Sequence, residues 1–214
     1  MKKISALFMA LTVLVLSVSC SSSENSESVI IPEESQTTTE IPESIEKPVL
    51  KISETEISYS ELDHENGTVV PVEYSVSGIV NGWSSSGIHI AFDDRLDLKT
   101  DDLDGSPNFE RGEASQYISS VISIRWQGEN PPDVLNGKNM DNLAIITADS
   151  SNSGYNGVIA TIDFIVPPDA KAGDVYNIEF FRYKTDCFRN IEFDSAMEEY
   201  AFANWQNGYI KITE

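Results

Sequence analysis

The chain has 214 residues, of which 35 are Asp or Glu and only 14 are Lys or Arg, so its formal net charge at pH 7 is −21. Such a surface excludes nucleic acid as a partner, because affinity for nucleic acid depends on Lys and Arg side chains that contact the phosphates. It also disfavours adsorption to anionic lipid. The acidity fits either simple solubility or a basic or cation-carrying partner.

Residues 1–20 have the pattern of an export signal. Lys2 and Lys3 precede an apolar run at residues 6–18, which has the length of a signal-peptide core rather than of a membrane span. The run leads into LSVSC at residues 16–20, which resembles the lipobox of bacterial lipoproteins. That resemblance implies lipidation of Cys20 and a location on the outer face of the cell membrane. Ordinary secretory cleavage near an incidental Cys is the alternative.

Residues 21–47 consist mainly of Ser, Thr, Glu and Pro. They show no periodic apolar face and cannot bury enough surface to fold, so we expect an extended, disordered acidic tether. A single folded domain then occupies residues 48–214. It holds only one cysteine, Cys187, which excludes an intramolecular disulfide framework and is typical of a small apolar side chain.

Alternation of apolar and polar residues dominates the domain and predicts an all-β fold. Val70, Val72, Tyr74 and Val76 share one face, and residues 88–92 and 158–166 show the same period of two. Five Asn-Gly pairs, which favour tight turns between antiparallel strands, separate or flank the runs. Short strands with frequent turns favour a β-sandwich. We expect strands at 48–53, 67–78, 86–93, 95–99, 115–127, 142–148, 157–166, 174–184 and 206–213.

One short helix is expected before the last strand. Asp194 can cap residues 195–202, which are good helix formers with acids in the first turn. The segment at residues 100–142 is long enough to form an additional flap.

Motifs for chemistry are absent from the sequence. His64 lies in a polar turn and His89 alternates with Ile88 and Ile90, so both are expected to face solvent, and a zinc site is not expected. No phosphate-binding loop and no nucleophile elbow occur. The acidic run at 100–105 does not match a calcium loop, because Thr100 and Arg111 would occupy ligand positions. The sequence therefore predicts a binding module rather than an enzyme.

Two adjacent segments carry a resemblance to a known family. Residues 157–164 (GVIATIDF) and 169–174 (DAKAGD) look like the seventh strand and following turn of cohesin domains, the receptor modules of cellulosome scaffoldins. Residues 67–72, 88–94, 143–149 and 207–212 resemble the second, third, sixth and closing strands in the same order. The resemblance covers nearly all of residues 48–214.

The cohesin resemblance implies a nine-stranded jelly-roll sandwich, a monomer, that binds the dockerin module of another protein in a cellulosome-type assembly. It implies no cofactor on this chain, since calcium belongs to the dockerin. Carried over by matching segments, the partner-binding residues would be Ser85, Gly87, His89, Ile146, Asp149, Arg189 and Ile191. The family often has Asn and Asp where this chain has Ser85 and Gly87.

A carbohydrate-binding surface lipoprotein on the same kind of sandwich is the rival interpretation. Trp83, Trp126 and Trp205 would then form a sugar-stacking platform. Three exposed, coplanar rings would favour that interpretation, whereas buried tryptophans beside a flat, partly apolar face would favour dockerin binding.

Overall fold

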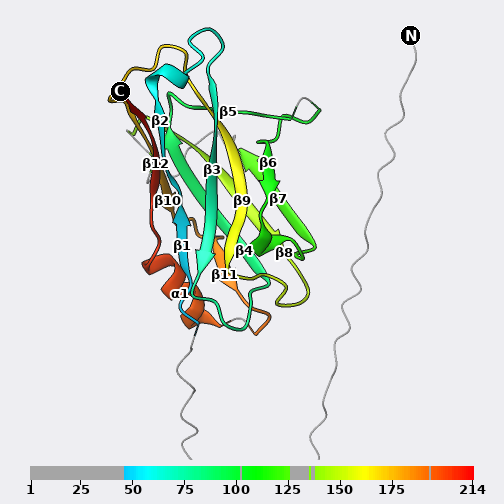
Figure 1. The fold of residues 1–214 in the computed structure, drawn as a ribbon. Coiled ribbons are helices and arrows are strands. Elements are labelled where there is room, and N and C mark those ends of the chain that lie inside the picture. Colours follow the sequence, from blue (N-terminus) through cyan, green and yellow to red (C-terminus); the bar gives the residue numbers. More distant parts are fainter. Residues whose placement is uncertain (1–45, 102, 126–134, 136–137, 193) are drawn as a thin grey trace, which may run out of the picture. The chain divides into compact units, whose positions relative to one another are not determined.

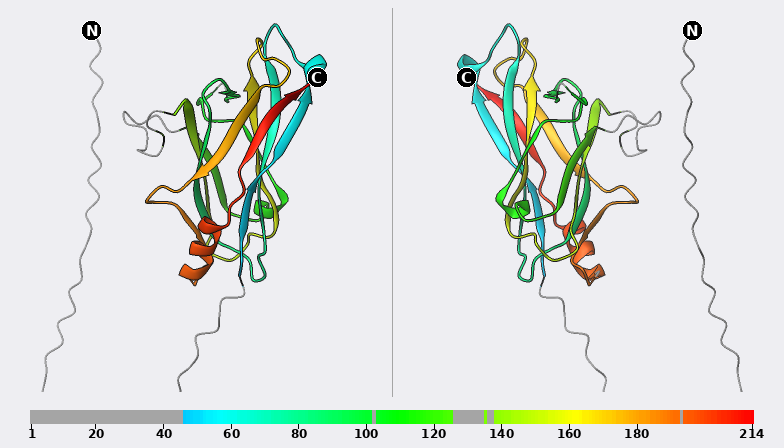
Figure 2. Two further views of the ribbon diagram at one scale, coloured as in Figure 1. Left: turned by 90° about the vertical axis from the view of Figure 1, so that its left-hand side faces the viewer. Right: turned by 90° about the vertical axis from the view of Figure 1, so that its right-hand side faces the viewer.

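The computed structural model describes residues 46–101, 103–125, 135, 138–192 and 194–214. They form two stacked β-sheets, with the helix α1 at one end of the sandwich and the C-terminus at the other (Figures 1 and 2). The predicted jelly-roll β-sandwich is therefore confirmed. The export signal with Cys20, the tether up to residue 45 and Trp126 lie outside the described residues.

The strand segments are β1 Val49–Ile52, β2 Glu54–Ser58, β3 Thr68–Ser77, β4 Ser85–Asp93, β5 Asp97–Leu98, β6 Phe109–Arg111, β7 Ser120–Arg125, β8 Met140–Ala148, β9 Gly157–Val166, β10 Val175–Phe181, β11 Cys187–Arg189 and β12 Gly208–Thr213. The helical elements that the described residues define include the 3-10 turns η1 Tyr59–Glu61 and η2 Glu113–Ser115 and the α-helix α1 Ser195–Ala203. Among the described residues, no helix is both long and apolar enough to cross a membrane.

Among these strands, the five-stranded sheet has the order β1-β3-β9-β5, with β6 also pairing with β9. The seven-stranded sheet has the order β2-β12-β10-β4-β8-β7, with β11 also pairing with β4. The chain changes sheets at Ser53, because β1 pairs with β3 whereas β2 pairs in parallel with β12. The strands β2, β6 and β11 were not expected from the sequence, and the strand expected at 115–127 starts only at Ser120, after the 3-10 turn η2 that ends at Ser115.

The core lies between the two sheets and is built from the predicted alternation. Val70, Val72, Tyr74 and Val76 are all buried. One expected core residue differs: Val158 is only half-buried, and Ile159 is fully buried in its place. The cause is a β-bulge beside Tyr74, where Ser75 pairs with Val158 and Ile159 is the extra residue.

Local signals in the sequence are confirmed where their partners are close in the chain. The Asp194 side chain accepts hydrogen bonds from the backbone N–H groups of Ala196 and Met197, so α1 begins where the cap predicts. Of the Asn-Gly glycines, Gly67, Gly82 and Gly157 adopt positive φ. Gly208 instead starts β12, and the pair at 136–137 lies outside the described residues.

Within the described residues, Glu46 and Lys47 already contact the domain ahead of the expected boundary at 48. Glu46 is buried, and its two carboxylate oxygens accept hydrogen bonds of 2.6 Å from the backbone N–H groups of Val80 and Asn81. Lys47 donates its backbone N–H to the carbonyl of Gly78. The start of the domain is thus attached to the loop that connects β3 with β4.

We expect Glu46→Ala to lower the free energy of unfolding by about 1–3 kcal/mol, because two backbone N–H groups lose the buried carboxylate that accepts from both of them. Urea unfolding of the variant measures this change. Glu73→Ala is the matched control, since the Glu73 side chain is exposed on β3, and it should change stability by no more than about 0.5 kcal/mol. Equal effects of the two substitutions would contradict the proposed role of Glu46.

Candidate partner-binding face

The side of the seven-stranded sheet that faces away from the core, here called the outer face, carries the residues expected to contact a partner. In β4 the residues Ser86, Ile88 and Ile90 point into the core, so Ser85, Gly87 and His89 belong to the outer face. The register places Gly87 opposite Ile146 on β8 and opposite Cys187 on β11. Residues from three strands therefore meet around Gly87.

Three isoleucines make this part of the outer face apolar. Ile122 and Ile124 on β7 are 44% and 45% exposed, and Ile146 on β8 is 38% exposed. Ile122 lies directly opposite Ile146 in the register of the two strands. We call Ile122, Ile124 and Ile146 the isoleucine patch. The prediction that Ile146 points outward is correct.

Sequence reasoning missed Ile122 and Ile124. The strand β7 reads SVISIR, and period-two reasoning would turn its isoleucines inward. The structure instead buries Val121 and Ser123, and the Ser123 hydroxyl donates to the carbonyl of Pro107 at 2.6 Å. The exposure of the two larger apolar side chains on a strand that buries a Ser is visible only in the structure, and it marks an interaction surface.

His89 is placed on the outer face as predicted, but it is not exposed. It is only 6% accessible, because the segment after β10 folds back over it and brings Asp186 within 2.7 Å of its Nδ1 atom. The rings of Phe181 and Tyr183 lie 5.3 Å and 5.2 Å from the imidazole. The expectation of a solvent-facing His89 is therefore wrong. His64, by contrast, is exposed as expected.

Arg189 and Ile191 lie at the same end of the sheet as Gly87. Arg189 is opposite Ser85 on β4, and its guanidinium forms an ion pair with Glu198 of α1. Ile191 follows β11 and is 49% exposed, while its backbone N–H donates to Asn152. Ser85, Gly87, Ile146 and Ile191 therefore offer accessible surface, whereas the charge of Arg189 is already compensated within the domain.

Asp149 directly follows β8 and is partly buried, and its carboxylate is occupied by the protein itself. It accepts hydrogen bonds from the backbone and hydroxyl of Ser119, both at 2.7 Å, and from the backbone and hydroxyl of Ser151. These bonds, above all those from Ser119, lower the pKa of Asp149 to about 2. The geometry gives Asp149 a loop-fixing role in addition to any contact with a partner.

The bonds of Asp149 predict a pH-dependent contribution to stability. Because its pKa in the folded state is below the value of 3.8 for a free carboxyl, its contribution is complete above pH about 4 and is lost as the pH falls toward 2. We expect Asp149→Asn to be less stable than the wild type at pH 7, with a smaller difference at pH 3. Urea midpoints at both pH values test this, and a difference independent of pH would contradict it.

The described tryptophans do not form an exposed platform for sugars. Trp83 is fully buried, and its indole N–H donates to the carbonyl of Tyr155 at 2.9 Å. Trp205 stacks on Phe180 and packs edge-on against Phe202. Trp126, the third ring of the rival interpretation, lies outside the described residues.

No group of three His, Cys, Asp or Glu side chains is placed to hold a metal ion within the part of the chain that the structure describes. In the acidic run at 100–105, the carboxylates of Asp101 and Asp104 accept hydrogen bonds from the backbone N–H groups of Leu103 and Ser106. Both carboxylates thus stabilise their own turn. Asp102 lies outside the described residues.

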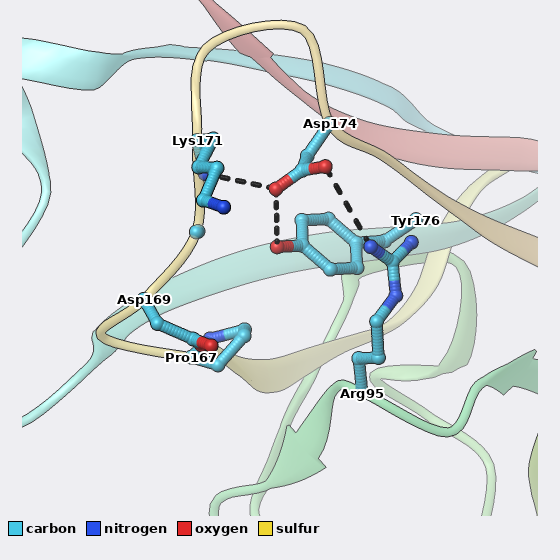
Figure 3. Close-up of a pocket in the computed structure, with 7 residues that line it drawn as sticks. Arg95, Pro167, Asp169, Lys171, Asp174 and Tyr176 are labelled. Atoms are coloured by element: carbon cyan, nitrogen blue, oxygen red, sulfur yellow. Dashed lines mark hydrogen bonds and ion pairs between the residues drawn. The ribbon is translucent and has the colours of Figure 1, made fainter.

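A hollow of about 400 Å³ lies near the end of β4 that is distant from Gly87, where the β9–β10 loop meets Arg95 (Figure 3). Its charged groups interact with one another: the Arg95 guanidinium lies 4.5 Å from the centre of the Tyr176 ring and 3.6 Å from the Asp174 carboxylate. The same carboxylate accepts the backbone N–H of Lys171 at 2.8 Å. Partial burial raises the pKa of Tyr176 to about 12. We therefore assign this hollow a role in fixing the loop.

Comparison with protein-family models and with curated proteins gives no match. Solved structures do match. A type III cohesin module from the cellulosomal cell-surface anchoring scaffoldin ScaE of Ruminococcus flavefaciens is 27% identical, with a TM-score of 0.64 over 78% of this chain and 88% of that chain.

Two cohesins solved in complex with dockerins share the fold at lower identity. The sixth cohesin of scaffoldin B from Acetivibrio cellulolyticus is 16% identical, with a TM-score of 0.52 over 77% of this chain and 98% of that chain. The OlpA cohesin of Clostridium thermocellum is 14% identical, with a TM-score of 0.53 over 78% of this chain and 99% of that chain. Cohesins are protein–protein interaction modules, which confirms the prediction of a non-enzymatic domain. The residues that the structure describes share the fold of cohesin modules.

Proposed function

We propose that this domain binds the dockerin module of another protein through the outer face around Gly87 and the isoleucine patch. The observation that carries the proposal is the exposure of Ile122, Ile124 and Ile146 side by side on two paired strands. Apolar side chains gathered on an otherwise highly acidic protein mark an interaction surface. Cohesins of the same fold have been solved in complex with dockerins, which supports this class of partner.

The partner class also fits the charge of the chain. A dockerin carries calcium ions, and a net charge of −21 favours approach of a partner with bound cations. Charge of this kind accelerates association, whereas the apolar contacts determine how slowly the complex dissociates. In this proposal the cohesin is a monomer without a cofactor of its own, and the dockerin-bearing protein is a polysaccharide-degrading enzyme or another scaffoldin.

Binding to secreted proteins of the same organism tests the proposal. The full chain without its signal should retain a calcium-loaded dockerin protein and release it when calcium is chelated, while its own β-sheet circular dichroism stays unchanged. Loss of the cohesin's structure on chelation would contradict the assignment of calcium to the partner. Retention of soluble glycans without any dockerin would favour the rival carbohydrate-binding function.

We further propose that the protein is attached to the outer face of the cell membrane through acylated Cys20, with residues 21–45 as a spacer. The LSVSC sequence before a polar segment supports this anchor, and the similar cohesin of R. flavefaciens comes from a cell-surface anchoring scaffoldin. Cys20→Ala should release the protein from the detergent phase or stop its processing. Unchanged membrane retention of that variant would exclude a lipid anchor at Cys20.

A further inference from the structure

The outer face contains a hollow of about 190 Å³ directly beside the isoleucine patch, here called the Gly87 pocket. Its lining includes Gly87 and His89 of β4, Ala144 and Ile146 of β8, and Thr185 and Cys187 of the segment that leads into β11. The pocket therefore lies on the surface that the proposed function assigns to the dockerin. Its shape and chemistry add information about that partner.

The absence of a side chain at Gly87 creates this pocket. Gly87 lies between Ile146 and Cys187, its cross-strand neighbours on either side, and both carry side chains on the outer face. A Cβ atom added to Gly87 would meet only the Sγ atom of Cys187, at 3.9 Å, which is an ordinary van der Waals distance. A larger residue can therefore fill the pocket without displacing the backbone. A glycine within a strand commonly marks the close approach of another group.

Apart from Thr185, which is exposed at the pocket, the hydrogen-bonding side chains in the lining already interact with one another. His89 contacts the Asp186 carboxylate at 2.7 Å, and the Thr147 hydroxyl lies 3.0 Å from that of Ser86. Burial raises the pKa of the Cys187 thiol, which keeps it neutral. A charged or amide side chain entering the pocket would lose its water without gaining an equivalent partner, whereas an aliphatic side chain would lose nothing.

The size of the pocket matches a single side chain. An apolar cavity of about 150 Å³ accepts a benzene molecule, so about 190 Å³ accommodates a Leu, Ile or Met side chain. Ile146 belongs both to the pocket and to the isoleucine patch, so a side chain in the pocket continues the apolar contact of the patch. A central apolar contact of this kind commonly dominates the energy of an interface.

We propose that the Gly87 pocket receives one aliphatic or Met side chain of the dockerin and that Gly87 determines which dockerins fit. This inference rests on the proposed function. A residue larger than Gly at position 87 would occupy the space that this side chain needs. The proposal thus gives a physical role to the position where the resembling family often has Asp.

A graded series at position 87 tests the proposal with the dockerin that the full-length wild type retains. We expect Gly87→Ala to weaken binding about threefold and Gly87→Leu at least about fiftyfold, with unfolding midpoints equal to or above that of the wild type. Asn177→Leu is the control, because Asn177 is exposed on β10, on the same face but distant from the pocket. Its affinity should equal that of the wild type. Undiminished affinity of Gly87→Leu would overturn the proposal.

A second measurement identifies the side chain on the partner. Each exposed aliphatic residue of the dockerin is changed to Ala and assayed against the wild type and against Gly87→Leu. One substitution should weaken binding to the wild type about tenfold or more but have almost no further effect on Gly87→Leu, since both changes remove the same contact. Fully additive effects for every dockerin residue would overturn the proposal.

A probe that needs no dockerin separates this inference from the proposed function. Xenon binds dry apolar cavities and should shift the NMR signals of Ala144 and Ile146 in the wild type but not in Gly87→Leu. Xenon shifts without any dockerin binding would preserve the apolar pocket while contradicting the proposed function. The absence of xenon shifts in the wild type would overturn the apolar character of the pocket.

Discussion

Ile146→Asp is expected to weaken dockerin binding by a factor of at least about 100 while the domain stays folded. Ile146 lies in the isoleucine patch and lines the Gly87 pocket, so the substitution places an unpaired carboxylate in a surface that the partner would desolvate. Leaving a charge unpaired in an interface costs roughly 2–5 kcal/mol, and about 2.8 kcal/mol corresponds to a factor of 100. Calorimetric titration with the retained dockerin measures the change.

Val175→Asp is the matched control for this experiment. Val175 is 40% exposed, close to the 38% of Ile146, and lies on the outer face of the same sheet at the far end of β10. Both variants place an acid at a half-exposed position on the outer face, but only Ile146→Asp changes the isoleucine patch and the Gly87 pocket. If Val175→Asp weakened binding as strongly as Ile146→Asp, the dockerin would bind elsewhere or added charge alone would explain the loss. Unfolding of Ile146→Asp would contradict its outward orientation.

The second large effect is expected at the buried pair of His89 and Asp186. Their side chains are 8% and 1% exposed, and Asp186 also accepts the backbone N–H of Tyr183 at 2.8 Å. His89→Ala leaves one oxygen of a buried carboxylate without its imidazole partner, and an unsatisfied buried acceptor costs about 1–3 kcal/mol, or more when it is charged. We expect urea unfolding to report a loss of this size.

A double-mutant cycle isolates the interaction between His89 and Asp186. His89→Ala combined with Asp186→Ala should cost clearly less than the sum of the two single substitutions, since the second change removes the group that the first leaves unpaired. His64→Ala is the control, because His64 is the other histidine of the chain and is exposed. A loss below about 1 kcal/mol for His89→Ala would show that water replaces the imidazole.

The position of this pair also links stability to the candidate face. Asp186 belongs to the segment that forms one wall of the Gly87 pocket, and His89 supplies part of its lining. The pair can therefore affect binding by positioning the pocket wall, in addition to the contact that His89 makes as part of the lining. His89 was assigned to the binding surface by the cohesin resemblance, and the structure adds its buried contact with Asp186.

The sequence by itself determined the features that depend on neighbours along the chain. Alternation predicted the long strands that build both sheets, because each inward side chain of a strand follows directly from the period of two. The cap at Asp194 predicted the start of α1, because its acceptor and the N–H groups it serves are only two and three residues apart. The outward position of Gly87 followed from the same alternation, whereas that of Ile146 was implied only by the cohesin resemblance.

Tertiary structure alone decided the features that depend on distant parts of the chain. Alternation separates the two faces of a strand, but it cannot say which face a later segment covers. His89 is buried by residues almost 100 positions away, and Asp149 bonds to Ser119, 30 positions away. Ile122 and Ile124 are exposed because β7 pairs with β8 in the register that turns Val121 and Ser123 inward. The Gly87 pocket likewise exists only because β8 and β11 both pair with β4, and long-range strand pairing of this kind is not encoded in any short stretch of sequence.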